Sequence, residues 1–277
     1  MKDHDLHQTF DQLYPYEGHG SLYKPQSYGK KSNYLMTCDW DGKLKQFSLQ
    51  DFELHRTYEN SHSKGARTMV ATHNSQHIFI ADLDGGLTYY TLEPEMSMVF
   101  RSKTKEHESA IRAMAITHDD TFLFTGSFDG ILKQHYIHPT AKCILIRKKW
   151  DDISPTSAGI TSIVISYDNE FVFVSDKDGI LRQFSIKNHS TARKFELPGE
   201  HGTMNCLCLS TNNISMFIGY RTGFLREINA KTGKIIKDYG WFDKLGIKSL
   251  FTTIDGVYLF IGGSNGNLLQ FELFNRT

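Results

Sequence analysis

Histidines and carboxylates are the residues of this chain best suited to chemistry, because they bind metal ions and transfer protons near neutral pH. The 277 residues include 13 histidines. Three of them precede an aspartate by the same 22 residues, in the pairs His19 and Asp41, His62 and Asp84, and His107 and Asp129. Zinc needs ligands that converge on one point. Because these pairs recur at wide intervals along the chain, their spacing favours a structural role over a metal site.

Other candidates for chemistry lack the partners that a catalytic site requires. The carboxylate pairs are Asp119–Asp120, at a turn where aspartate is favoured for backbone reasons, and Asp151–Asp152, in the stretch RKKWDDISPTSAG. Histidines without a repeated partner are read as surface or packing residues: His73, His77, His118, His135 and His138. The four cysteines form no C-x-x-C pair, and the sequence has no phosphate loop, nucleophile elbow or zinc motif. We therefore expect no catalytic residue, metal or cofactor, and predict that the chain is not an enzyme.

A tight-turn dipeptide that recurs every 43 to 49 residues organises the chain. Asp-Gly and Asn-Gly favour two-residue hairpin turns, because these turns require positive φ. The six copies are Asp41-Gly42, Asp84-Gly85, Asp129-Gly130, Asp178-Gly179, Thr222-Gly223 and Asn265-Gly266. Short runs rich in β-branched and aromatic residues flank each turn, such as FLFTGS and ILKQHYI, and they indicate strands. With an apolar run before each pair and a polar run after it, each repeat predicts a four-stranded blade of a β-propeller.

With these repeats the chain resembles the WD-repeat propellers, in which a Gly-His enters each blade and an Asp lies in the turn between the second and third strands. In that family the His, the turn Asp and a Ser or Thr of the second strand form a hydrogen-bond chain with a terminal Trp. The resemblance implies structural hydrogen bonds within blades for His19, Asp41, His62, Asp84, His107, Thr125 and Asp129. The Trp register holds Phe47, Tyr90, His135, Phe184, Ile228 and Phe271. The function that the resemblance implies is a rigid scaffold for binding other proteins.

The sequence predicts one all-β domain over residues 1–277, a β-propeller of six four-stranded blades. Residues 5–10 (DLHQTF) match residues 53–58 (ELHRTY), so we expect the N-terminal strand to complete the last blade and close the ring. The expected parts are 1–18 as closing strand and lead-in, and blades over about 19–61, 62–106, 107–155, 156–200, 201–242 and 243–277. The alternative is seven blades, in which case a partner chain supplies one blade or the chain is a fragment.

Cationic residues recur at the start of the predicted innermost strands, at Lys24, Arg67, Arg112 and Lys248. The position before each turn dipeptide adds Trp40, Phe128, Lys177 and Arg221. The family resemblance places both registers near the mouth of the central channel. We hypothesise that this face binds an acidic or phosphorylated segment of another protein. The simpler interpretation is that these side chains only reach past packed stems to solvent.

Charge and hydropathy narrow the range of partners. Thirty-one basic residues balance 31 acidic ones, and such a chain exerts no long-range attraction on nucleic acid or an anionic membrane. No secretory signal or membrane-spanning run is found, so we expect a cytoplasmic or other intracellular location, not secretion. We predict a non-catalytic interaction scaffold or a subunit of a larger assembly, with proteins as partners and no small-molecule substrate. The alternative is a metal-dependent hydrolase on a six-blade propeller, which the cationic strand starts disfavour.

Overall fold

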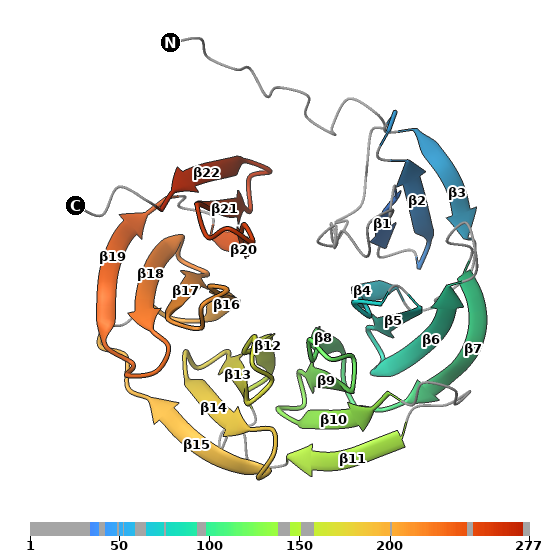
Figure 1. Cartoon of the computed structure of the whole chain (residues 1–277), viewed down its shortest axis with the longest axis horizontal. Helices are drawn as coiled ribbons and strands as arrows, with labels where there is room; N and C mark the ends of the chain where they lie inside the picture. The colour runs from blue at the N-terminus through green and yellow to red at the C-terminus, as the bar shows by residue number, and fades with distance from the viewer. Residues whose placement is uncertain are drawn as a thin grey trace.

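The structure is a computed structural model that describes residues 34–38, 42–48, 50–51, 53–58, 65–74, 76–92, 98–137, 145–150, 158–199, 201–242 and 246–273. These residues form 22 strands in six antiparallel sheets, and no helix occurs among them (Figure 1). The prediction of an all-β chain is therefore confirmed for the described residues. No helix in this part of the chain could span a membrane.

Three sheets form the first half of the ring. The first contains β1 (Tyr34–Cys38), β2 (Leu44–Ser48) and β3 (Leu54–Tyr58). The second contains β4 (Ala66–Ala71), β5 (His77–Asp82), β6 (Gly86–Leu92) and β7 (Met98–Lys105). The third contains β8 (Ile111–Ile116), β9 (Phe122–Ser127), β10 (Leu132–Tyr136) and β11 (Leu145–Trp150).

Three further sheets follow in chain order. The fourth contains β12 (Ile160–Ile165), β13 (Phe171–Asp176), β14 (Leu181–Ser185) and β15 (Ser190–Phe195). The fifth contains β16 (Met204–Leu209), β17 (Ser215–Tyr220), β18 (Phe224–Asn229) and β19 (Ile235–Trp241). The sixth contains β20 (Ile247–Thr252), β21 (Tyr258–Gly263) and β22 (Leu268–Glu272).

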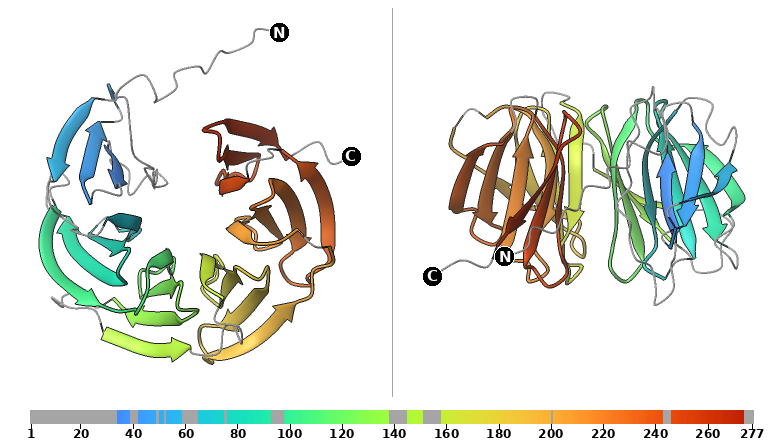
Figure 2. Two further views of the ribbon diagram at one scale, coloured as in Figure 1. Left: turned by 180° about the vertical axis from the view of Figure 1, so that it is seen from behind. Right: turned by 90° about the horizontal axis from the view of Figure 1, so that it is seen from above.

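The six sheets stand around a common centre in chain order, which gives a propeller-like arrangement (Figures 1 and 2). From the second sheet to the sixth, the first strand of each sheet lies nearest the centre. In the four-stranded sheets the fourth strand lies at the rim (Figure 1). In the second to sixth sheets the predicted turn dipeptides connect the second and third strands, and their glycines have positive φ, for example 79° at Gly130 and 76° at Gly179. In the first sheet Gly42 lies between β1 and β2 and also has a positive φ, 77°.

The hydrophobic core lies between neighbouring sheets. Side chains alternate between the two faces of a strand, so each sheet presents apolar residues to the sheet before it and to the sheet after it. Phe124 of the third sheet, for example, packs with Ile160 and Val174 of the fourth, and all three are fully buried. Small residues allow this close approach: a Cβ on Gly126 would lie 2.5 Å from Cγ2 of Ile160.

The described strands form an open ring, with an opening between the β1–β3 sheet and the β20–β22 sheet (Figures 1 and 2). The predicted closing strand, residues 5–10, lies outside the described residues, as does the predicted inner strand of the first sheet. Closure by the N-terminal strand therefore stays a prediction. The first and last sheets have three described strands each, whereas the four between them have four.

Candidate functional site

The hairpin connections place the predicted cationic residues at one end of the ring. Consecutive hairpin turns lie at opposite ends of a sheet, so the start of each first strand and the turn between its second and third strands share an end. Arg67, Arg112 and Lys248 are the second residues of β4, β8 and β20. Lys177 and Arg221 directly follow β13 and β17, in the turns at the same end. We call the surface formed by these five residues and Phe128 the cationic face.

The positive charges of the cationic face lie close enough to affect one another. The pKa of Arg112 is lowered to about 10, first by burial and then by the charges of Arg67 and Arg221. The pKa of Lys248 is lowered first by burial and then by the same three arginines. Four sheets thus contribute one cation each to a shared region at one end of the ring. Among the described residues, no carboxylate is a main cause of either of these two pKa shifts.

Phe128 connects two of the cations through its ring. The guanidinium carbon of Arg112 lies 4.9 Å from the ring centroid, and Nζ of Lys177, from the next sheet, lies 3.9 Å from it. Both distances are within the range of cation–π attraction. Gly159 leaves the space for this ring, because a Cβ there would lie 2.6 Å from Cδ1 of Phe128. The ring therefore holds two positive charges at a junction between the third and fourth sheets.

Backbone hydrogen bonds fix the turns that carry these side chains. The amide that follows the second strand donates to a carbonyl just before the first strand of the same sheet. The bonds are Phe128 to Ala110 at 3.0 Å, Lys177 to Gly159 at 3.0 Å, Arg221 to Thr203 at 2.9 Å and Ser264 to Gly246 at 3.0 Å. Because four sheets repeat the same bond, the cationic face is built on rigid supports. Lys24 and Trp40, which were predicted for this face, lie outside the described residues.

The third sheet brings three predicted structural residues together. Nδ1 of His107 lies 3.1 Å from Oδ2 of Asp129, and its Nε2 lies 2.8 Å from Oγ1 of Thr125. The same hydroxyl lies 2.8 Å from Nε2 of His135, a buried residue of β10. His107, Thr125 and His135 are almost completely buried, so these bonds satisfy polar atoms that water does not reach. The sequence analysis placed His135 at the register of the family's tryptophan and interpreted it as a surface or packing residue. It did not predict the hydrogen bond to Thr125.

The corresponding positions of other sheets are not equivalent. His19, Asp41 and His62 lie outside the described residues, so their predicted bonds stay predictions. Asp84 is exposed, and its amide donates to Oδ1 of Asp82 at 3.0 Å. In the fifth sheet His201 stacks on Phe224 with ring centroids 3.8 Å apart. The imidazole of His201 therefore packs against an aromatic ring in a sheet that has Thr222 in place of the turn aspartate.

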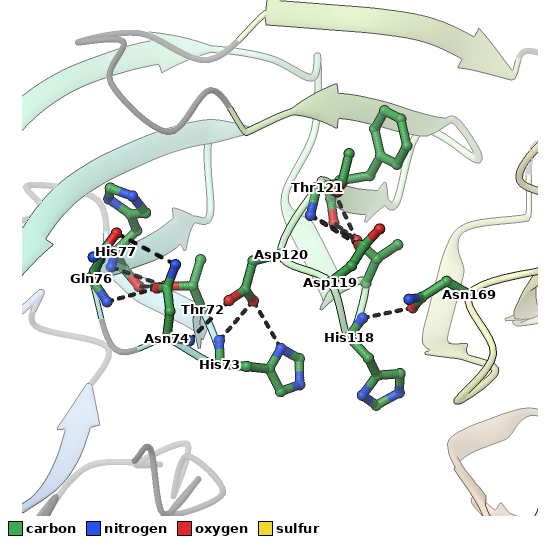
Figure 3. Close-up of polar contacts among 12 residues, drawn as sticks. Thr72, His73, Asn74, Gln76, His77, His118, Asp119, Asp120, Thr121 and Asn169 are labelled. Atoms are coloured by element: carbon green, nitrogen blue, oxygen red, sulfur yellow. Dashed lines mark hydrogen bonds and ion pairs between the residues drawn. The ribbon is translucent and has the colours of Figure 1, made fainter.

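At the opposite end of the ring, turns of the third, fourth and fifth sheets each bond to the preceding sheet, and Figure 3 shows the bonds made by Asp120 and Asn169. Oδ1 of Asp120 accepts a 2.7 Å hydrogen bond from the amide of His73 in the second sheet. Oδ1 of Asn169 accepts at 2.7 Å from the amide of His118, and Oδ1 of Asn213 accepts at 2.8 Å from the amide of Tyr167. We call these three bonds the inter-sheet latches. One of them uses Asp120, which the sequence analysis assigned only to a turn.

The acidic groups of the described residues do not gather into a candidate metal site. No group of three or more histidine, cysteine, aspartate or glutamate side chains within the described ranges is placed to hold a metal ion. Asp119 and Asp120 have different roles. Asp119 accepts a hydrogen bond from Thr121 within its own turn, whereas Asp120 bonds to the second sheet.

Comparison with known proteins identifies one repeat of the chain. Residues 99–135 match the WD40 family model, described as WD domain, G-beta repeat. The matched stretch runs from β7 through β10 and includes His107, Thr125 and Asp129. A search of curated proteins found no match. A WD40 repeat therefore lies in the part of the ring that contains the hydrogen-bond network of His107, Thr125, Asp129 and His135.

Proposed function

We propose that this chain, with its WD40 repeat at residues 99–135, is a non-catalytic scaffold that binds an acidic or phosphorylated segment of a partner protein on its cationic face. WD40 repeats in general support protein–protein interaction, and the propeller-like arrangement offers a rigid surface for it. The positions of the cations on the cationic face support the proposal that the bound segment is acidic or phosphorylated.

The observation that carries the proposal is the convergence of Arg67, Arg112, Arg221 and Lys248 from four different sheets. Like charges at close range repel, and burial increases the cost of keeping them charged. An anionic group placed among them relieves both effects and gains charge-assisted hydrogen bonds, which are stronger than neutral ones. Phosphoryl and carboxylate groups of a polypeptide have this chemistry.

The accessible members of the cationic face support binding to a large partner. Lys177, Arg221 and Lys248 are exposed, whereas Arg67 and Arg112 are partly buried. An incoming segment would contact the exposed cations first and place its anionic group near the two partly buried arginines. Arginine and aromatic residues also contribute strongly to protein interfaces, and Phe128 supplies the aromatic ring.

Affinity purification with mass spectrometry tests this function. The double variant Arg67→Glu, Arg112→Glu should lose the partners that the unaltered protein retains, because it reverses two charges at the centre of the cationic face. Lys187→Glu, Lys231→Glu is the matched control, since both lysines are exposed in turns at the opposite end of the ring. If the arginine variant does not fold, Arg221→Glu replaces it at an exposed position. Retention of the same partners by a folded charge-reversed protein would contradict the proposal.

A further inference from the structure

The last sheet exposes a leucine that every other sheet buries. The leucine two residues after the turn glycine packs under the following sheet in five successive sheets. Its exposed fraction is 0% at Leu44, 2% at Leu87, 0% at Leu132, 0% at Leu181 and 0% at Leu225. The sixth copy, Leu268, is 69% exposed. The β20–β22 sheet therefore presents the same surface as the other sheets, but without a following sheet among the described residues.

Aromatic residues extend this exposed surface. Phe79, Phe124, Phe173 and Phe217 share one register and are at most 3% exposed, each packed against the following sheet. The copy in the last sheet is Phe260, which is only partly buried, and its ring lies 6.4 Å from that of Phe251. Strand pairing places Phe251, Phe260 and Leu268 on one side of the sheet. We call this surface the end face.

The five interfaces between described neighbouring sheets show what kind of surface covers the residues equivalent to those of the end face. Leu225, for example, packs with Ile247, Leu259 and Ile261, which are aliphatic residues of the first two strands of the next sheet. The same arrangement recurs at each earlier junction. The complementary surface is thus a β-sheet with aliphatic side chains on its inner strands.

We propose that a β-sheet from a partner protein packs on the end face and fills the opening between the β20–β22 and β1–β3 sheets. In Figures 1 and 2 this opening is wider than the interval between any two neighbouring sheets. The edge of the last sheet is also available for strand addition, because β22 pairs only with β21 among the described strands. Both the face and the edge would then be completed by the partner.

Close packing at the existing junctions favours an inserted sheet over contact with the first sheet of the same chain. A Cβ on Gly126 would lie 2.5 Å from Cγ2 of Ile160, and one on Gly219 would lie 2.6 Å from Cγ2 of Ile247. Interfaces with so little free space resist a change of angle. Bringing the first sheet onto the end face would require a change of angle at one or more of these junctions, whereas an inserted sheet requires none.

A defined probe for the missing sheet is a copy of residues 201–242, appended to the carboxyl end of the full chain through a flexible linker. This copy carries the β16–β19 sheet, whose own first strands already cover Leu181 of the preceding sheet. We expect a higher melting temperature and a several-fold fall in the fluorescence of a dye that binds exposed apolar surface. The same fusion with Leu268→Asp is the matched control and should show neither change. Equal melting and dye binding with and without the appended sheet would overturn the proposal.

Two further experiments distinguish coverage of the end face by a partner from coverage by other parts of the same chain. Deletion of residues 1–18 should leave dye binding unchanged, and a several-fold rise would overturn the proposal by showing that these residues cover the end face. A Thr37→Cys, Leu268→Cys variant should form no internal disulfide under mild oxidation. Its formation in most molecules would show that the first sheet packs on the end face. Because neither arm alters the cationic face, their outcomes are independent of the function proposed for it.

Discussion

At the scale of single residues, the buried network of the third sheet shows what a sequence can and cannot specify. His107, Thr125 and Asp129 share a register with family residues, and the structure places them within hydrogen-bond distance. His135 was not predicted to join them, because its role depends on β10 pairing with β9, which brings its Nε2 to 2.8 Å from the hydroxyl of Thr125. The signal that could have identified this role is a histidine at the tryptophan register, where four other repeats have phenylalanine or tyrosine.

His135 makes the stability of the protein dependent on pH. Burial, followed by the charges of His107 and Lys133, lowers its pKa from 6.5 to about 3. Between these values the unfolded chain binds a proton that the folded chain does not, so the free energy of unfolding falls as the pH falls. We expect a contribution of up to about 1.4 kcal/mol per pH unit in this window, measured by chemical denaturation from pH 7 to pH 4.

The variant His135→Phe isolates this contribution. Phenylalanine or tyrosine occupies the same register in four other repeats, so a ring without a titratable group fits the position. The variant should show a shallower decline in the free energy of unfolding between pH 7 and pH 4 than the unaltered protein. Identical slopes for the two proteins would mean that His135 does not take up a proton on unfolding.

At the scale of strands and turns, the hairpins were predicted correctly because local chemistry determines them. Asp-Gly and Asn-Gly sequences specify the turns between second and third strands, and alternating apolar residues specify the strands beside them. The inter-sheet latches could not be predicted in this way. Asp120 bonds to His73 and Asn169 bonds to His118, which are residues 47 and 51 positions away in the chain. Only the packing of one sheet on the next brings these turns together.

Substitution of Asn169 tests the contribution of a latch. Its φ of 60° is a left-handed conformation that glycine adopts without strain and alanine does not. Asn169→Gly removes only the bond to His118 and should cost about 1 kcal/mol of unfolding free energy. Asn169→Ala adds backbone strain and should cost about 1 kcal/mol more. Chemical denaturation of both variants measures the difference, and an unchanged stability for the glycine variant would show that the latch contributes nothing.

At the scale of the whole molecule, the repeat spacing predicted the order of the sheets, and the described residues form six sheets in that order. Among the described strands the ring is open between the first and last sheets, and closure by residues 5–10 stays a prediction because these residues lie outside the described part of the chain. Repeat length alone does not predict the angle between neighbouring sheets, because this angle depends on side-chain packing at each junction. The gathering of cations was expected from their register. The position of Phe128 between Arg112 and Lys177 was not, since it joins residues of two different sheets.

The central claim is that the cationic face recognises an anionic segment. The most direct measurement is the affinity of the purified protein for an array of acidic peptides that carry either serine or phosphoserine. The account predicts binding that weakens as salt increases, and that is at least about tenfold weaker for Arg67→Glu, Arg112→Glu but unchanged for Lys187→Glu, Lys231→Glu. Equal affinity for all three proteins, or no binding to any anionic peptide, would contradict it.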